Sequence, residues 1–291
     1  QGAFYNIAKI AATGGLVYLA GTFIKHYGVT KAWMFIMLII AVIMVVVGVY
    51  HYAILPNSNE DSERKPTSLS KSMDELLKVF LDFFTKKHIV YYICFIILYR
   101  FAEGFVIKIV PLFLKAPRIS QGLGLSEQEI GVYYGTFGAA AFVIGSILAG
   151  YYIAWRGLQK SLFSLALVFN IPFVAYTFLA LYQPNSMWLI GGGIVMEYFG
   201  YGFGFVGLTL FMMQQVAPGK HQMSHYAFAS GIMNLGVMLP GMISGYICDK
   251  IGYQHFFIMV LICTIPALLI TWFVPFSYPD TTEKAKNEAT T

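Results

Sequence analysis

The strongest constraint on the fold is a series of long apolar stretches. A helix of about 20 apolar residues crosses the hydrocarbon core of a bilayer, whereas an open sheet leaves backbone groups there without hydrogen bonds. Eight such stretches occur, at residues 3–23, 33–54, 88–114, 130–152, 161–181, 187–213, 226–248 and 256–274. Only 11% of the residues are charged, against about a quarter in a typical soluble domain. The sequence therefore predicts an all-α membrane protein with eight transmembrane helices in the lipid bilayer.

The distribution of lysine and arginine predicts which side each loop occupies, because cytoplasmic loops carry an excess of them. If the long loop at 55–87 is cytoplasmic, eleven lie on that side and five on the other. The eleven are Arg64, Lys65, Lys71, Lys78, Lys86, Lys87, Arg156, Lys160, Lys220, Lys284 and Lys286, and the five are Lys25, Lys31, Lys115, Arg118 and Lys250. We therefore expect a multi-pass protein with a cytoplasmic C-terminus.

The long loop becomes amphipathic in its second half. Ser72 and Glu75 have the spacing of a helix capping box. Apolar residues then repeat with helical period at Met73, Leu76, Leu77, Phe80, Phe83 and Phe84. We expect a helix lying on the cytoplasmic membrane face, which either connects two bundles or has a regulatory or partner role.

Charged residues inside the predicted spans are the candidates for function, because an ionised group in the bilayer must face a polar cavity or be paired. Arg100 and Glu103 are three residues apart and therefore lie on one helical face, and Glu197 lies in the middle of the span at 187–213. A buried acid that gains and loses a proton can couple transport to a proton gradient. We predict Glu103 and Glu197 as proton-coupling residues and Arg100 as a substrate-binding residue. Alternatively, Arg100 and Glu103 form a fixed structural pair, and Glu197 is hydrogen-bonded to a neighbouring helix.

Further polar residues extend this predicted surface. Tyr226, Ser230 and Asn234 follow at four-residue intervals, as do Glu197 and Tyr201, and four-residue spacing places side chains on one helical face. Lys9 and Lys108 either bind substrate or extend towards the lipid headgroups. The predicted substrate-binding residues are therefore Arg100, Lys108, Lys9, Tyr201, Tyr226, Ser230 and Asn234, with Asn170, Tyr133 and Tyr134 as further candidates.

Several other classes of function lack support in the sequence. The net charge of +5 comes without a basic stripe, which argues against nucleic-acid binding. The GxGxxG pattern of Gly202, Gly204 and Gly207 lies inside a predicted membrane helix, and His221 and His225 lack a third metal ligand. The sequence contains no HExxH, GxSxG or P-loop lysine motif. We expect no metal, no cofactor other than the proton gradient, and no enzymatic activity; a membrane-embedded enzyme or a sensor that does not transport is the alternative.

Five stretches of sequence carry a resemblance to a known family. They are LYRFAEGF at 98–105, LSEQEIG at 125–131, MEYFGYGFGF at 196–205, HYAFASG at 225–231 and SGYICDKIGYQ at 244–254. With six spans after a long loop, the chain resembles the AmpG muropeptide permease group of the major facilitator superfamily. One loop departs from the superfamily's GxxxDRxGRK motif: GYYIAWRGLQK at 150–160 keeps Gly150 and Gly157 but has Ala154 in place of the acid.

The resemblance implies two six-helix bundles with the substrate site between them. Residues 1–54 are then the last two helices of an N-terminal bundle whose first helices are missing, 55–87 the cytoplasmic linker, 88–275 the complete C-terminal bundle and 276–291 a cytoplasmic tail. It also implies a monomer in the bacterial inner membrane that imports anhydromuropeptides, small anionic glycopeptides, together with protons. Another organic anion, such as a sugar acid or an acyl-CoA-like solute, is the alternative substrate.

Overall fold

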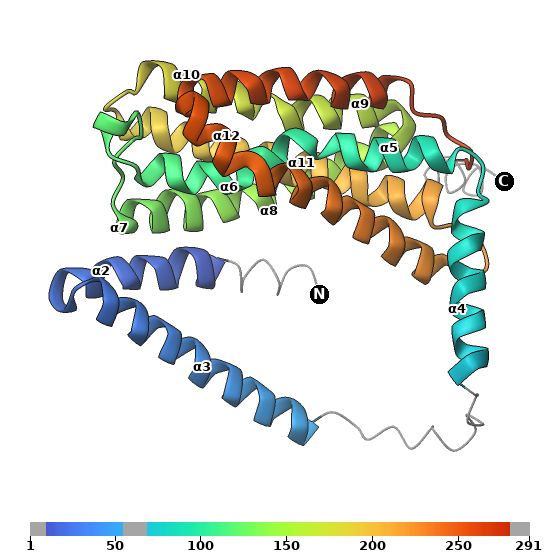
Figure 1. Cartoon of the computed structure of the whole chain (residues 1–291), viewed down its shortest axis with the longest axis horizontal. Coiled ribbons are helices and arrows are strands. Elements are labelled where there is room, and N and C mark those ends of the chain that lie inside the picture. The colour runs from blue at the N-terminus through green and yellow to red at the C-terminus, as the bar shows by residue number, and fades with distance from the viewer. Residues whose placement is uncertain (1–9, 55–68, 280–291) are drawn as a thin grey trace.

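The computed structural model describes residues 10–54 and 69–279, which form helices joined by short loops (Figure 1). The α-helices are α2 (Val17–Tyr27), α3 (Val29–Ile54), α4 (Leu69–Phe84), α5 (Ile89–Tyr99), α6 (Phe101–Lys115), α7 (Glu127–Ile130), α8 (Gly138–Arg156), α9 (Leu158–Asn170), α10 (Pro172–Tyr182), α11 (Met187–Phe211) and α12 (Gln222–Trp272). Three π-helical segments, η1 (Ile10–Leu16), η4 (Gly131–Phe137) and η5 (Met212–Val216), and a 3₁₀ turn, η3 (Arg118–Ser120), complete the described elements.

The helices have the length and composition of membrane spans. Within the described ranges, five helical stretches are long and apolar enough to cross a membrane: Val29–Ile54, Glu127–Arg156, Leu158–Tyr182, Met187–Val216 and Gln222–Trp272. The all-α membrane character predicted from the sequence is therefore confirmed. The number of eight spans stays a prediction. The first span lies partly outside the described residues, the span at 88–114 is divided between α5 and α6, and the spans at 226–248 and 256–274 lie in one element, α12.

The span predicted at 88–114 is wrong as one continuous helix. It is broken at Arg100, whose backbone dihedral angles (φ −106°, ψ 7°) end α5 and precede the first residue of α6. An apolar run predicts the length of a span, but it carries no signal for a break of one residue. The break sets the Arg100 side chain at the junction of two helices, which becomes important for the candidate site below.

Glycines with positive φ make the tight turns between consecutive spans. Gly157, with φ 86°, separates α8 from α9. This glycine, which the loop at 150–160 shares with the superfamily's GxxxDRxGRK motif, therefore forms a turn. Gly252, with φ 75°, divides α12 into two arms that contain the spans predicted at 226–248 and 256–274. Glycine adopts positive φ without the steric cost that a Cβ atom brings, which explains its place at both turns.

The capping box predicted at Ser72 and Glu75 is wrong. Helix α4 begins at Leu69, so Ser72 lies inside the helix and not at its N-cap position. The error arises because the spacing of two residues does not show where the preceding turn of helix begins. The apolar residues that predicted a helix here do lie within α4, and the helix runs across the end of the bundle formed by α5 to α12 (Figure 1).

The interior of this bundle contains two apolar clusters. One includes Phe113 of α6, and the other includes Phe95 of α5. Tyr201 and Phe205 of α11 pack against both clusters. The interior region around these two residues is therefore the place where the two clusters meet.

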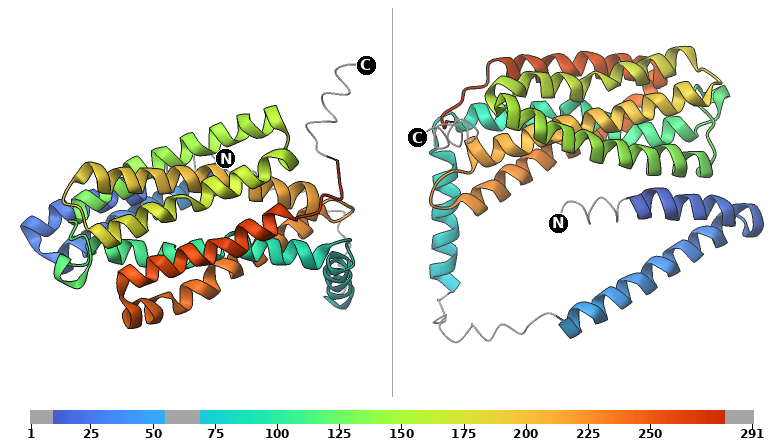
Figure 2. Two further views of the ribbon diagram at one scale, coloured as in Figure 1. Left: turned by 90° about the horizontal axis from the view of Figure 1, so that it is seen from above. Right: turned by 180° about the vertical axis from the view of Figure 1, so that it is seen from behind.

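The first helices touch the bundle at the end opposite α4 (Figure 2). η1 packs on η4, α2 packs on α7, and α3 packs on α2. The approach is close: a Cβ atom at Gly131 would lie 2.7 Å from the backbone nitrogen of Tyr18, and one at Gly21 would lie 2.6 Å from Cγ of Gln128. Gln128 also donates a hydrogen bond of 3.4 Å to Thr22.

The division of the chain into 1–54, 55–87, 88–275 and 276–291 stays a prediction.

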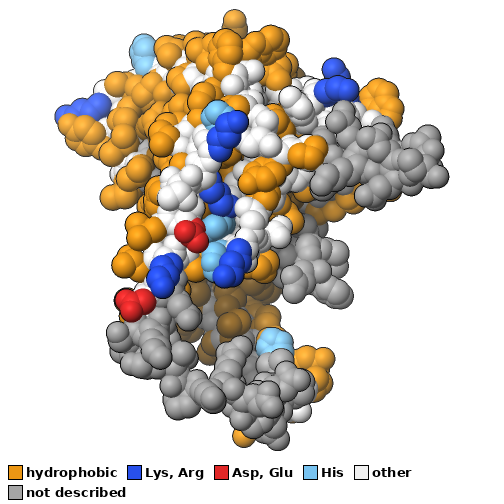
Figure 3. All heavy atoms as spheres, turned by 90° about the vertical axis from the view of Figure 1, so that its right-hand side faces the viewer, with side chains coloured by type: hydrophobic (Ala, Val, Ile, Leu, Met, Phe, Trp, Pro, Cys, Tyr) orange, Lys and Arg blue, Asp and Glu red, His pale blue; other side chains and the backbone are white. Residues whose placement is uncertain are grey.

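At the α4 end, side chains join segments that are distant in the sequence. Lys86 Nζ donates hydrogen bonds to the carbonyls of Val216 (2.6 Å) and Pro218 (2.8 Å), and burial lowers the pKa of this amine. Gln215 Oε1 accepts hydrogen bonds from the backbone nitrogens of Ser277 (2.8 Å) and Tyr278 (3.0 Å). Figure 3 views this end, where lysine, arginine and histidine side chains lie among apolar ones. That the α4 end of the bundle faces the cytoplasm stays a prediction.

Candidate transport site

A buried ion pair joins Arg100 to Glu103 where α5 meets α6. The guanidinium donates two hydrogen bonds to the carboxylate, from Nε to Oε2 (2.6 Å) and from Nη2 to Oε1 (2.7 Å). The two residues are only 5% and 6% exposed. A bidentate pair compensates charges that burial makes costly, and the first turn of a helix favours the negative charge of Glu103. The geometry is therefore that of a bidentate ion pair.

Aromatic residues of α11 cover the guanidinium of Arg100. Its Cζ atom lies 5.8 Å from the ring centroid of Tyr201 and 5.2 Å from that of Phe205, and Nη2 lies 3.5 Å from the Tyr201 hydroxyl. These distances are those of cation–π contacts. The Tyr201 ring is itself held by Phe142 and Phe169, at centroid distances of 5.0 and 6.0 Å. Aromatic rings therefore cover the guanidinium side of the ion pair.

Glu197 lies on the same face of α11 as Tyr201, one helical turn earlier. Its Oε2 accepts a hydrogen bond of 2.8 Å from the hydroxyl of Tyr176 in α10. Tyr176 is fully buried and stacks on Phe257 at a centroid distance of 5.7 Å. Glu197 is only half-buried, whereas Glu103 is almost completely buried. The two acids therefore differ in how deeply they are buried in the bundle.

Four tyrosines lie in this region of the bundle; we call Tyr134, Tyr176, Tyr198 and Tyr201 the tyrosine cluster. The rings of Tyr134 and Tyr198 meet edge to face at 5.0 Å between centroids. Tyr176 donates a hydrogen bond to Glu197, and the Tyr201 hydroxyl lies beside the guanidinium of Arg100. The cluster therefore brings together residues of η4, α10 and α11.

Four other predicted site residues lie on α6 and α12. Lys108 is exposed on α6 and runs beside Gly241 of α12. Tyr226 and Ser230 are half-buried on α12 and Asn234 is exposed. In the described part of the chain, the hydrogen bonds of Arg100 and Glu103 involve none of these four residues. Their role in substrate binding stays a prediction, and Lys9 lies outside the described residues.

Two further candidates have local roles. Asn170 donates a hydrogen bond of 2.8 Å to the carbonyl of Ala166 in its own helix. The ring of Tyr133 lies 5.8 Å from that of Phe137 and covers Gly191. Tyr134, the remaining one of the three further candidates, belongs to the tyrosine cluster.

Three residues that contact predicted site residues were absent from the sequence prediction. They are Tyr176 of α10 and Tyr198 and Phe205 of α11. The signal for Tyr198 and Phe205 was their place in the MEYFGYGFGF stretch, beside Glu197 and Tyr201. Tyr176 had no signal beyond a hydroxyl inside an apolar span, because its contact with Glu197 depends on how two helices pack.

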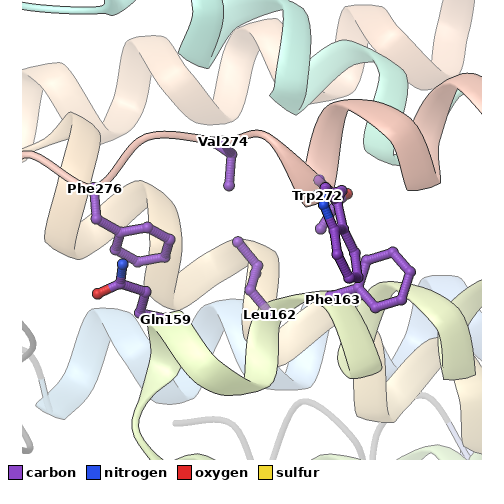
Figure 4. A pocket seen from close by; sticks show the side chains of 7 residues that line it. Gln159, Leu162, Phe163, Trp272, Val274 and Phe276 are labelled. Carbon is purple, nitrogen blue, oxygen red and sulfur yellow. The ribbon is translucent and has the colours of Figure 1, made fainter.

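Surface pockets occur elsewhere on the bundle. A pocket of about 270 Å³ lies between the start of α9 and the end of α12. Figure 4 shows Phe163 beside Trp272 at one side of it, and Gln159 near Phe276 at the other. A second pocket, of about 320 Å³, lies between α2 and α7 and includes Lys25 and Lys115. Arg100, Glu103 and Glu197 line neither of these two pockets, and the ion pair itself is buried.

A membrane bundle with a buried bidentate ion pair and a second interior acid has the chemistry of a secondary transporter. Residues 2–219 match the model of the Major Facilitator Superfamily, and the chain belongs to this family of transporters. The resemblance identified in the sequence is thereby confirmed at the level of the superfamily.

Relatives with AmpG names align along most of the chain. A protein of Rickettsia bellii and one of Rickettsia conorii, both named AmpG 1, are each 23% identical over 91% of this chain and 62% of their own length. A Rickettsia prowazekii protein named AmpG 2 is 25% identical over 72% of this chain and 50% of its own length. The chain thus spans less than two thirds of the length of these relatives.

Proposed function

We propose that this protein is a proton-coupled secondary transporter that imports anhydromuropeptides or related cell-wall degradation products. The names of the relatives support the substrate class. The observation that carries the coupling mechanism is the bidentate Arg100–Glu103 pair, which is 5% and 6% exposed in the interior of the bundle. We further propose a monomer in the bacterial inner membrane, with eight spans in this chain and its C-terminus in the cytoplasm.

The pair supplies a mechanism for coupling. When an anionic substrate takes the guanidinium of Arg100, Glu103 loses its counter-charge in a buried site, and it is then stable only after it binds a proton. When substrate and proton leave, the pair forms again. Because the two states differ in charge and contacts, each favours a different open side of the transporter. Substrate and proton therefore cross together.

The substrate class is tested by uptake. The full-length protein is placed in proteoliposomes with an inward proton gradient, and labelled anhydromuropeptide is compared with a sugar acid and an acyl-CoA. We expect accumulation of the anhydromuropeptide, which collapses when a protonophore removes the gradient. An enzyme converts substrate without accumulating it. Equal uptake with and without the gradient contradicts proton coupling.

The second candidate substrate is another organic anion. The Arg100 fork recognises a carboxylate irrespective of the sugar or peptide attached to it. Tyrosine rings beside the site also suit a sugar, because the ring covers its apolar face while the hydroxyl donates or accepts a hydrogen bond. Accumulation of the sugar acid, with no uptake of the anhydromuropeptide, identifies this candidate.

A further inference from the structure

Helix α4 contacts α12 through aromatic residues near its C-terminal end. Phe83 is fully buried, and its ring centroid lies 5.7 Å from that of His225 and 5.8 Å from that of Phe228. The Phe80 ring lies 5.6 Å from Phe228. Apolar side chains nearer the start of α4, such as Leu76, are exposed. Among the described side chains, the contact between α4 and α12 is therefore concentrated around Phe83.

His225 lies in this contact and binds the backbone of α4. It is 3% exposed, and its Nε2 atom lies 3.2 Å from the carbonyl oxygen of Val79. A carbonyl oxygen only accepts hydrogen bonds, so Nε2 carries the hydrogen. The other ring nitrogen, Nδ1, is buried and has no hydrogen-bond partner in the described part of the chain. The contact therefore fits a neutral His225 with its hydrogen on Nε2.

A second proton on His225 is unfavourable while α4 is in place. It gives Nδ1 an N–H group without an acceptor, and it places a positive charge between the rings of Phe83 and Phe228. Burial of an unpaired donor and of a charge are both costly, and exposure to water removes both costs.

The charged and titratable groups near His225 do not offset this cost. They are Asp82 of α4, Lys86 in the turn after α4, and His221 before α12. The His221 ring lies 6.0 Å from that of His225, and its Nε2 atom lies 3.9 Å from a carboxylate oxygen of Asp82. Asp82 supplies one negative charge, which is opposed by the positive charge of Lys86 and, at low pH, by that of His221.

We propose that His225 is a pH-sensitive latch, which holds α4 on α12 when it is neutral and releases α4 when it is protonated. Histidine is the side chain whose charge ordinarily changes between pH 5 and 8. The helices α3 and α4 are consecutive in the chain, so the docking of α4 determines where the chain from the first helices reaches the bundle. The latch goes beyond the proposed function, because it concerns the position of α4 and not the transport step.

The latch is tested by measuring the position of α4 at two pH values. Spin labels are attached to Asp74→Cys in α4 and Ala154→Cys in α8, two exposed positions, in the full-length protein without its native cysteines. Double electron–electron resonance gives the distribution of distances between the labels. We expect one narrow distribution at pH 8 and its loss to a broad one at pH 5.5, across the range in which histidine titrates. A narrow distribution that is the same at both pH values contradicts the latch.

Substitutions in the labelled protein show whether His225 is responsible. His225→Gln keeps a donor for the Val79 carbonyl, and His225→Phe keeps an aromatic ring, but neither side chain can be protonated. Both variants should lose the difference between pH 8 and pH 5.5. His221→Gln is the matched control, since it removes the neighbouring histidine four residues earlier, and it should release α4 at pH 5.5 as wild type does.

Two results overturn the proposal: release at pH 5.5 that persists in His225→Gln and His225→Phe, or release that disappears in His221→Gln. Either result assigns the pH response to another group. Because the distance between the labels is measured without substrate or a proton gradient, these outcomes are independent of whether the protein transports anhydromuropeptides.

Discussion

The hydroxyl of Tyr99 donates a hydrogen bond of 2.9 Å to the carbonyl of Gly204. This bond joins the last residue of α5 to α11. Each bonded residue directly precedes a residue of the site: Arg100 follows Tyr99, and Phe205 follows Gly204. Tyr99 is fully buried, so this bond is shielded from water. The break in the helix at Arg100 is thereby fixed relative to the residues that cover the guanidinium.

Tyr99→Phe should therefore weaken the protein without changing its fold. The loss of a hydrogen bond between buried groups costs about 1 kcal/mol, and the Gly204 carbonyl then keeps only the hydrogen bond of its own helix. We expect a lower thermal unfolding temperature in detergent and weaker binding of substrate at Arg100. Tyr91→Phe is a control for a hydroxyl bonded to a carbonyl elsewhere, that of Ile270. An unfolding temperature equal to that of wild type contradicts the structural role of the bond.

Arg100→Lys should weaken substrate binding even though the positive charge remains. Lysine is a point charge and loses the two-pronged geometry that fits a carboxylate. Hydrogen bonds to charged groups are worth about 1.5–3 kcal/mol, which corresponds to a loss of affinity of roughly tenfold or more. The half-saturating substrate concentration in exchange assays measures this loss. Unchanged affinity shows that Arg100 does not contact the substrate.

Gly131→Val should separate the first helices from the bundle. A Cβ atom at this position lies 2.7 Å from the backbone nitrogen of Tyr18, which is too close for a carbon atom, so the start of α2 must move away from η4. In a background without the native cysteines, Thr22→Cys and Gln128→Cys should cross-link readily, because these side chains are hydrogen-bonded. We expect Gly131→Val to abolish this cross-link.

The control for this experiment is Gly150→Val, because a Cβ atom at Gly150 has open space around it. The cross-link should form in this variant as it does in the parent. Efficient cross-linking in Gly131→Val shows that the contact between α2 and η4 is looser than the structure has it.

Lys86→Met should remove a pH-dependent contribution to stability. Burial lowers the pKa of Lys86 from its usual value, so the unfolded chain binds more protons than the folded chain below about pH 10.5. The stability that Lys86 gives therefore rises with pH in this range, and a neutral amine still has donors for Val216 and Pro218. We expect the difference in unfolding temperature between wild type and Lys86→Met to be larger at pH 9.5 than at pH 7. A smaller difference at pH 9.5 contradicts the assignment.

The sequence predicted the helical membrane fold because long apolar runs leave few alternatives to a spanning helix. It also predicted the proximity of Arg100 and Glu103, since a separation of three residues along a helix is local geometry. The break at Arg100 and the Tyr176–Glu197 contact had no such signal, because both depend on how helices pack. The position of Asn234 shows the same limit: the spacing predicted its helical face but not what that face meets.

The most direct test of the account is proton-driven uptake by Glu103→Gln, with the full-length protein in proteoliposomes. Glutamine has nearly the size of glutamate and mimics its protonated form, so the variant can bind substrate but cannot exchange a proton. We predict that it exchanges labelled substrate between the two sides and fails to concentrate it under a pH gradient. If Glu103→Gln still accumulates substrate against its concentration gradient, Glu103 is not the coupling acid and the central claim is wrong.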